Sequence, residues 1–560
     1  MISRASWIVL CMLFCILLVF SVGCESDEEN NADGDHDLLT DGDGEEDSIE
    51  KEVEQEAPAK AVYIILTTEA LQNVANEYSA YRQSKGFAVE VHTSTEINGS
   101  GEADLIQNIH ALLEKKANEE QTAPNYLLIL SDGAGSDENA ESFINPLDCE
   151  NMLGECYTDN TFADLTGDGI PDVAVGRVAA RTAEEARGYL EKIKDYEANY
   201  PVGIFNRRIN LYAGEPGFGP QIDGMLEMAV FQALETLDHA FDIVGTYASP
   251  TSPYFYRPFE DKVRDVFNEG SIITLYIGHG TSDWTEGLDM DGLENIHCTN
   301  RKPVSFLFAC SNGEFRGQVP CIAEALMLKS DGPIATFAAS GVSHPYGNAI
   351  LPYEIQRALL DQKPETVGEA IMLAKRYSIE NNDKFRRLID SSADASGEVP
   401  KADQPVIMRQ HLDLYNFFGD PALVIRYPER IDFKPGITTG SLAEGTLTVE
   451  GQAPGLGNGT AQVSLEVKRD KLVNALETVD DDDASQSMTD KIQSNWLKAT
   501  NKNVAAVSVE MKDGVFKATM NFPTEVVSYP SQNPVKSFYL KVYASDGSKD
   551  AFGSLDLNKE

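Results

Sequence analysis

The sequence predicts an α/β protein with a mostly parallel sheet flanked by helices, followed by a small all-β sandwich. Short apolar runs rich in β-branched and aromatic residues are typical of buried strands, and they alternate with longer segments typical of helices. After about residue 432 the pattern changes to short alternating runs separated by Gly, Asn and Asp, which indicates the sandwich. The length of 560 residues also exceeds what one ordinary core contains.

We expect five parts along the chain. They are a signal peptide over 1–24, an acidic linker over 25–60, an N-terminal α/β sub-domain over 61–205, a second α/β sub-domain over 206–430 and the sandwich over 432–560.

The first residues resemble an export signal. Arg4 supplies a positive charge, and the apolar run Trp7–Phe20 is too short to span a bilayer comfortably. The segment that ends in Gly23-Cys24 resembles a bacterial lipoprotein cleavage site, although Ser21 stands where an aliphatic residue is usual. We expect a lipid on Cys24 that holds an exported protein at a membrane, in the periplasm or on the cell surface. Ordinary cleavage and an uncleaved anchor are the alternatives.

The charge of the chain is strongly negative. A formal net charge of −45 argues against nucleic acid as a partner, because such binding needs a basic surface. The linker Glu25–Glu56 holds sixteen acidic residues and one lysine. It has too little apolar surface to fold and predicts a disordered spacer. Weak calcium binding by Asp33–Asp37 and Asp41–Glu45 is the alternative.

Strands and helices alternate through the two α/β sub-domains, which indicates βαβ units. The expected strands are Ala61–Leu66, Phe87–Val91, Tyr126–Leu130, Val173–Val175, Arg208–Ala213 and Pro333–Ala339. The expected helices are Glu69–Lys85, Asp104–Lys116, Thr182–Asn199, Met225–Thr236, Phe259–Glu269, Ile322–Leu328, Tyr353–Leu360 and Val367–Asn381.

The loop from Asp164 to Asp172 is the best candidate for a structural Ca²⁺ site. Its spacing matches the oxygen ligands of an EF-hand loop, including the glycine at the sixth position. Val175 stands where the bidentate glutamate is needed, so an Asx/Gly-rich turn is the alternative. The candidate ligands are Asp164, Thr166, Asp168, Ile170 and Asp172.

Two apolar runs in the second sub-domain end in reactive side chains. The run from Ser271 delivers His279 between two glycines, and the run from Pro303 delivers Cys310. Chemistry collects at the carboxyl ends of strands in parallel sheets, so neighbouring strands would place imidazole and thiol together. The imidazole would take the proton of the thiol, and the backbone N–H groups of Gly280 and Cys310 would bind an oxyanion. Trp284, in the loop after His279, is a candidate for lining the substrate cleft, with a core position as the alternative.

These motifs resemble a known family. Tyr-Ile-Gly-His279-Gly, Phe-Ala-Cys310-Ser-Asn-Gly-Glu-Phe and Pro-Cys321-Ile-Ala-Glu324 are similar to the catalytic core of the gingipain-type cysteine peptidases. The resemblance runs from about Ala61 to about Tyr427. It implies a caspase-like fold with two sub-domains and an immunoglobulin-like domain after the catalytic region. Glu324 itself is expected to be a packing or hydrogen-bonding position.

The resemblance also implies further site residues. Glu215 matches the acidic residue that steadies the catalytic histidine in this family. Asp223 lies near the position where some family members use an acidic residue to bind a basic P1 side chain, although the local spacing differs in this chain. Ser343, His344 and Tyr346 fall where the family builds a wall of its specificity pocket.

Cysteine usage agrees with an exported protein. Without the signal and Cys24, five cysteines are left, so at least one thiol should stay free. Cys149 and Cys156 are close enough to form a disulfide, and Cys310 is the candidate for the free thiol. Cys298 and Cys321 are expected either to pair or to be buried.

We therefore predict an exported cysteine endopeptidase that acts on protein or peptide substrates, with a possible preference for cleavage after basic residues. We expect a monomer and no cofactor for catalysis. The alternatives are a sortase-like transpeptidase of the same family and a catalytically inactive surface-binding lipoprotein.

Overall fold

The computed structural model describes residues 61–97, 102–120, 124–133, 143–199, 201–217, 236–397, 399–433, 439–441, 444–524 and 538–557, together with 230 and 234. The signal segment, the acidic linker and Asp223 lie outside these residues. So does most of the helix expected over Met225–Thr236, of which Val230 and Leu234 are helical.

A ten-stranded sheet runs through both α/β sub-domains in the order β2-β1-β3-β6-β15-β14-β13-β9-β7-β8. Its strands are β1 Val62–Thr67, β2 Ala88–Thr93, β3 Pro124–Leu130, β6 Ala174–Val178, β7 Arg208–Ala213, β8 Asp242–Tyr247, β9 Ile273–Ile277, β13 Val304–Phe308, β14 Ala335–Ala339 and β15 Tyr415–Phe418.

The sheet consists of two parallel halves that run in opposite directions. β15 pairs in parallel with β6 but antiparallel with β14, and every other pair in the sheet is parallel. The prediction of a mostly parallel α/β sheet is therefore confirmed. The late return of β15 to the middle of the sheet joins the two sub-domains.

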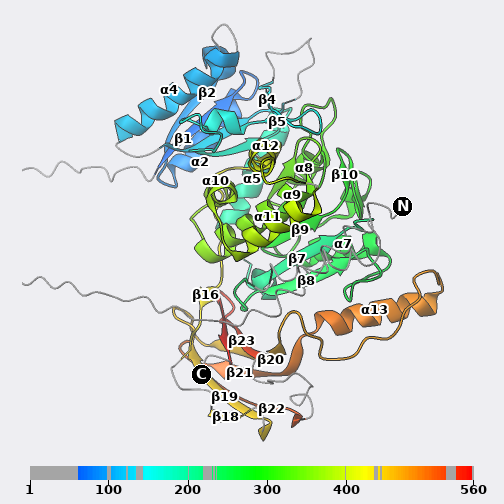
Figure 1. Ribbon diagram of the computed structural model, residues 1–560. Coiled ribbons are helices and arrows are strands. Elements are labelled where there is room, and N and C mark those ends of the chain that lie inside the picture. The colour runs from blue at the N-terminus through cyan, green and yellow to red at the C-terminus, as the bar shows by residue number, and fades with distance from the viewer. Residues whose placement is uncertain are drawn as a thin grey trace, which may run out of the picture.

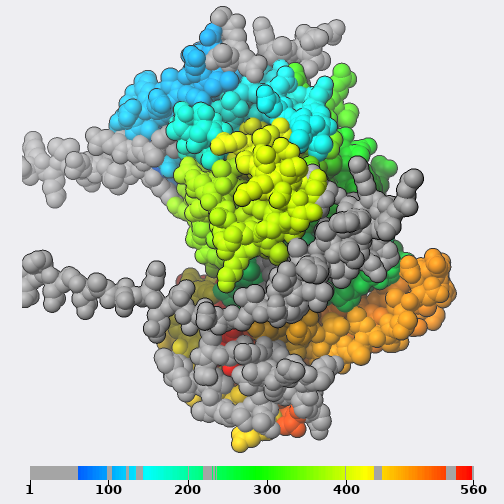
Figure 2. Space-filling model, in the orientation of Figure 1, coloured from blue at the N-terminus to red at the C-terminus, as the bar shows by residue number. Residues whose placement is uncertain are grey.

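Helices cover both faces of the sheet. They are α2 Gln72–Gln83, α3 Ser94–Ile97, α4 Glu102–Glu120, α5 Ala183–Ala198, α7 Phe259–Glu269, α8 Ile322–Leu328, α9 Pro345–Gln356, α10 Val367–Glu380, α11 Lys384–Ser396 and α12 Gln404–Leu414. Figure 2 shows the yellow segment of α9 to α12 between the blue and cyan N-terminal sub-domain and the orange segment that holds α13.

The burial of β1 shows why the first strand reads as a continuous apolar run. Tyr63 and Ile65 pack in the main core cluster, whereas Ile64 and Leu66 pack in a second cluster with α4. A strand that is buried on both faces needs no polar alternation. The helices that follow begin at ordinary signals: Thr182 accepts from the backbone N–H of Glu185 at the start of α5, in a capping box.

Two further sheets form the C-terminal region around one apolar cluster. One contains β16 Glu429–Arg430, β20 Gly459–Val467, β21 Asn503–Met511, β23 Phe538–Ser545 and β24 Asp550–Asp556; the other contains β17 Asp432–Phe433, β18 Thr439–Ser441, β19 Thr446–Gln452 and β22 Val515–Asn521. The immunoglobulin-like character of this region stays a prediction.

Helix α13 (Gln486–Thr500) was not expected in the β-rich region. It lies in the connection between β20 and β21 and projects beneath β8 in Figure 1. The Trp496 indole donates to the backbone oxygen of Gly245 on β8, at 2.9 Å. Because β8 is the last strand of the large sheet, α13 covers an edge that could otherwise pair with another chain.

Among the described residues, no helix combines the length and apolar character needed to cross a bilayer.

Candidate active site

His279 and Cys310 follow two strands that lie side by side. β9 and β13 pair in parallel with Ile277 opposite Phe308, and each chain reaches its reactive residue two positions later. Adjacent strands are about 4.8 Å apart. The structure therefore brings His279 and Cys310 to the ends of neighbouring strands at the carboxyl edge of this half of the sheet.

Both reactive side chains are accessible. His279 is exposed and Cys310 is partly exposed. The thiol lies 3.9 Å from the backbone oxygen of Ser343 and 3.7 Å from its hydroxyl oxygen. A substrate can therefore reach the sulfur from solvent, while Ser343 contacts it from the protein side.

The hydroxyl of Tyr276 holds the backbone that presents His279. It donates to the carbonyl oxygen of His279 at 2.6 Å and accepts from the backbone N–H of Glu286 at 3.0 Å. The Tyr276 ring stacks on Tyr212 with centroids 4.8 Å apart. Gly278 must lack a side chain, because a Cβ there would lie 2.4 Å from the Tyr276 hydroxyl.

Asn312 joins the histidine loop to the cysteine loop. Its amide donates to the backbone oxygens of Thr281 and Trp284, at 2.6 and 2.9 Å. The same amide lies where a Cβ on Gly280 would be, within 2.6 Å, so position 280 requires glycine. Ser311, between Cys310 and Asn312, adopts a φ of 58°, which is uncommon for a residue other than glycine.

Small antiparallel strands follow His279 and position a carboxylate that the sequence did not indicate. They are β10 Gly280–Thr281, β11 Trp284–Thr285 and β12 Leu288–Asp289. Gly280 pairs with Thr285, so Glu286 follows opposite His279. The Glu286 carboxylate accepts from the backbone N–H of Glu215 at 2.7 Å and lies 2.5 Å from the position of a Cβ on Gly214.

The Glu215 side chain is exposed. The carboxylate that sits over the ends of β7 and β9 is therefore that of Glu286, and the role expected for Glu215 stays a prediction. Glu286 comes to lie opposite His279 only when β10 pairs with β11 in the folded hairpin. No local sequence motif marks that pairing.

The predicted pocket residues occupy different environments. Trp284 is 39% exposed and Ser343 is buried beside the thiol. His344 is the N-cap of α9, and its ring accepts from the backbone N–H of Tyr346. Tyr346 is 5% exposed, and its hydroxyl donates to Asp390 at 2.6 Å, so this side chain faces the core and not a cleft.

The start of α9 corrects the sequence prediction for this segment. The helix was expected from Tyr353 but begins at Pro345 and ends at Gln356. Proline at the first helical position after an N-cap residue is a normal start signal, because its missing N–H would have no partner there.

The disulfide prediction is confirmed, and Cys298, Cys310 and Cys321 are free. Cys149 and Cys156 close the hairpin of β4 (Leu147–Asp148) and β5 (Tyr157–Thr158). Cys298 and Cys321 are buried, and burial raises the pKa of the Cys298 thiol to about 12 and that of Cys321 well above its usual value. Cys310 is the accessible thiol of the three.

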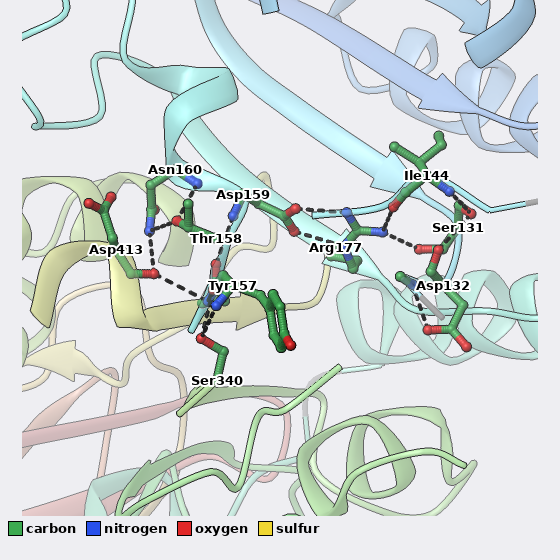
Figure 3. A network of polar contacts seen from close by, with 12 residues as sticks. Ser131, Asp132, Ile144, Tyr157, Thr158, Asp159, Asn160, Arg177, Ser340 and Asp413 are labelled. Atoms are coloured by element: carbon green, nitrogen blue, oxygen red, sulfur yellow. Dashed lines mark hydrogen bonds and ion pairs between the residues drawn. The ribbon is translucent and has the colours of Figure 1, made fainter. Parts of the chain in front are cut away.

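Figure 3 shows how this hairpin is fixed to the sheet. Arg177, fully buried, donates two hydrogen bonds of 2.7 Å to Asp159, and further bonds to the backbone oxygens of Ser131 and Ile144. A buried ion pair is tolerated when its remaining donors are also satisfied, as they are here.

The hairpin in turn supports the strand end beside Cys310. The Ser340 hydroxyl donates to the backbone oxygen of Tyr157 at 2.6 Å and accepts from its N–H at 3.0 Å. One residue further, the oxygen of Gly341 accepts from the N–H of Ser311 at 2.9 Å. The disulfide hairpin and the cysteine loop are therefore connected through the Ser340 hydroxyl and the Gly341 carbonyl.

Glu324 is a buried hydrogen-bonding residue, as the sequence indicated. Its carboxyl group accepts from the backbone N–H of Cys321 at 2.7 Å, at the start of α8. Its other carboxyl oxygen is buried close to Asp132, which is paired with Arg181. Burial, followed by the charge of Asp132, raises the pKa of Glu324 to about 8. This shift favours the protonated form of Glu324 at neutral pH.

The Asp164–Asp172 loop uses its carboxylates within itself. Asp164 accepts from the backbone N–H groups of Gly167, Asp168 and Gly169 at 2.8 to 3.1 Å, and Asp172 accepts from Thr166. In the part of the chain that the structure describes, no group of three or more His, Cys, Asp or Glu side chains is placed to hold a metal ion. The observed contacts are those of an Asx-rich turn, and the calcium site stays a prediction.

Comparison with known proteins gives a consistent result. The family model of peptidase family C25 matches residues 56–426. Gingipain R2 from Porphyromonas gingivalis is 23% identical over 376 residues, which cover 65% of this chain and 46% of that protein. Gingipain R1 from the same organism is 23% identical over the same length, with 34% of that protein covered. The chain thus spans less than half the length of these relatives.

The solved structures show the same fold. The crystal structure of the Arg-specific cysteine proteinase gingipain R superimposes with a TM-score of 0.50 at 17% identity, covering 90% of this chain and 99% of that one. A complex of the pro- and mature domains of Porphyromonas gingivalis RgpB gives the same TM-score and identity over 89% of this chain and 99% of that one.

Proposed function

Because the chain belongs to peptidase family C25, we propose that it is an exported cysteine endopeptidase that cleaves peptide bonds with Cys310 and His279. The observation that carries this proposal is the register of β9 and β13, which delivers the two residues to one sheet edge. The exposure of both side chains supports it, because the reaction needs access to a polypeptide.

In the proposed reaction, His279 accepts the proton of the Cys310 thiol, and the thiolate attacks the scissile carbonyl carbon. The backbone N–H groups of Gly280 and Cys310 are proposed to stabilise the oxyanion. His279 then donates its proton to the leaving amine, which departs and leaves a thioester. Water, deprotonated by His279, hydrolyses the thioester and restores the thiol.

The backbone around His279 supports this role. Tyr276 and Asn312 hold the backbone of His279 and of the loop that follows it through four hydrogen bonds of 2.6 to 3.0 Å. Glu286 is proposed, beside Glu215, as a carboxylate that favours the imidazolium. A carboxylate near the far ring nitrogen would orient the ring and stabilise its charged form.

The proposal also covers the substrate preference of the enzyme and its location in the cell. We propose Arg or Lys at P1, bound by Asp223, with Trp284, Ser343 and His344 along the cleft. Gingipain R, with the same fold, is described as Arg-specific, which supports testing this preference. Export and a lipid on Cys24 would place the enzyme at a bacterial membrane.

The test is turnover of fluorogenic peptides that differ at P1, by a soluble form that begins at Ala59. Wild-type protein should cleave, Cys310→Ala should not, and Cys298→Ala should retain activity because that thiol is buried away from the site. Loss of the basic preference in Asp223→Asn would support the P1 assignment. A folded wild-type protein without turnover, and with Cys310 resistant to iodoacetamide, would contradict the proposal.

The same assay separates hydrolysis from peptide transfer. Adding a nucleophilic amine would yield a ligated product if the chain were a transpeptidase. The family match favours hydrolysis over this alternative, and the accessible His279 and Cys310 argue against an inactive binding protein.

A further inference from the structure

We propose that the Ser343 hydroxyl is a catalytic hydrogen-bond donor to the Cys310 thiolate, and that Asn348 and Tyr415 position it. The inference rests on the cysteine peptidase function proposed above and assigns a role in stabilising the thiolate of the nucleophile. Its starting point is the distance of 3.7 Å between the Ser343 oxygen and the Cys310 sulfur.

The orientation of the Ser343 hydroxyl follows from its neighbours. The Asn348 amide donates to the Ser343 oxygen at 2.8 Å, and the Tyr415 hydroxyl donates to the Asn348 oxygen at 2.7 Å. Since Asn348 uses the serine oxygen as an acceptor, the serine hydrogen is free to point elsewhere.

Two acceptors lie within reach of that hydrogen. One is the Cys310 sulfur, and the other is the Tyr415 hydroxyl oxygen, which lies beside Ser343. Burial raises the pKa of Tyr415 far above its ordinary value, so the phenol is neutral. A hydrogen bond to a charged acceptor is about twice as strong as one to a neutral acceptor. Ser343 therefore turns to the sulfur when Cys310 loses its proton to His279.

The same switch accompanies the rest of the reaction. When the thiolate forms the thioester, its charge disappears and the serine hydrogen returns to the Tyr415 oxygen. Ser343 makes and breaks no covalent bond in any step. Its contribution is confined to the states in which the sulfur is negative.

The surrounding segment is held firmly, as a preorganised donor requires. Ser343 is 6% exposed and Tyr415 is fully buried at the start of β15. The backbone N–H of His344 donates to the His411 ring at 3.0 Å. A Cβ on Gly347 would lie 2.2 Å from the same ring, so α9 packs directly on α12. The donor thus sits between two packed helices and the central strand.

The test is the pH dependence of Cys310 alkylation by iodoacetamide, measured on the folded protein. Ser343→Ala should raise the midpoint pH by about one unit and slow alkylation about 10-fold at pH values below both midpoints. Ser340→Ala is the matched control, because that hydroxyl lies in the same segment but bonds to Tyr157 and Leu414. Its midpoint should equal that of the wild type.

A second pair of variants tests the positioning by Asn348. In Asn348→Asp the new carboxylate accepts a hydrogen bond from the Ser343 hydroxyl and draws it away from the sulfur. The midpoint pH of Cys310 alkylation should therefore rise further than the added charge alone would cause. The charge effect alone is measured by making the same change in Ser343→Ala, where the rise should be smaller.

Three results would overturn the proposal. They are an unchanged midpoint in folded Ser343→Ala, a rise of the same size in Ser340→Ala, and equal effects of Asn348→Asp with and without Ser343. After any of these results, the proposed peptidase function still stands if Cys310 of the wild-type protein is alkylated and the wild-type protein cleaves peptides. If wild-type Cys310 neither reacts nor cleaves, the peptidase function itself is contradicted.

Discussion

Replacing Glu324 with Gln should make the protein less sensitive to alkaline pH. Glu324 is 1% exposed, lies close to Asp132 and has its pKa raised to about 8 by burial and by the charge of Asp132. The folded state therefore keeps this proton between about pH 4.5 and 8, whereas the unfolded state releases it. By linkage, the free energy of unfolding of the wild type falls as pH rises through this range.

The size of the effect follows from the shift. A rise of the pKa from 4.5 to about 8 changes the free energy of unfolding by at most about 5 kcal/mol, at 1.36 kcal/mol per pKa unit. Some of this penalty is relieved when the site relaxes and water enters, so we expect about 2–4 kcal/mol. Gln keeps the shape of protonated Glu and has no proton to lose. The variant should therefore gain about 2–4 kcal/mol relative to the wild type between pH 5 and pH 9.

The assay is urea unfolding followed by circular dichroism at five pH values, in a Cys310→Ala background that prevents self-digestion. Glu185→Gln is the control for loss of a capping interaction, because Glu185 holds the equivalent position in the capping box of α5. If the difference between Glu324→Gln and its parent stays constant from pH 5 to pH 9, or if the parent gains stability as pH rises, the inference that folded Glu324 keeps its proton is wrong.

Three further predictions concern the supports of the site. Tyr276→Phe removes the hydrogen bonds to the His279 oxygen and from the Glu286 N–H. The value of kcat/KM should therefore fall about 10-fold with little change in melting temperature. Unchanged kinetics would contradict a role of Tyr276 in holding the backbone of His279. Asn312→Ala frees the 281–284 loop and should raise KM about 5- to 20-fold, which peptide titrations would measure; a change in kcat alone would argue against it. Replacing Cys149 and Cys156 together by Ser opens a loop closed by residues seven positions apart and should lower the free energy of unfolding by about 2–3 kcal/mol; a stability equal to that of the oxidised wild type would show that the disulfide adds nothing.

The sequence predicted what is determined locally. The runs before His279 and Cys310 are strands because they are apolar, β-branched and bounded by Gly and Pro, and strand ends are where such side chains act. The disulfide followed from short spacing between Cys149 and Cys156. The resemblance to gingipain-type peptidases was confirmed by the family match over residues 56–426.

What the sequence did not reveal depends on contacts between distant segments. Glu286 reaches the sheet edge only because the β10–β11 hairpin folds it back over Gly214. Helix α13 lies within a β-rich region, and its place is set by the Trp496 contact with β8. Tyr346 was expected in the pocket because the family resemblance places its loop in the pocket wall, but α9 already begins at Pro345 and Tyr346 is buried with its hydroxyl on Asp390.

The account depends most directly on Cys310 acting as the nucleophile with His279 as its base. A peptidyl acyloxymethyl ketone, which reacts with activated cysteine thiolates, should label the folded protein once, and peptide mapping should place the label on Cys310. Labelling should be lost in Cys310→Ala and greatly slowed in His279→Ala. A label on Cys298 or Cys321, or equal labelling of wild type and His279→Ala, would contradict the proposed dyad.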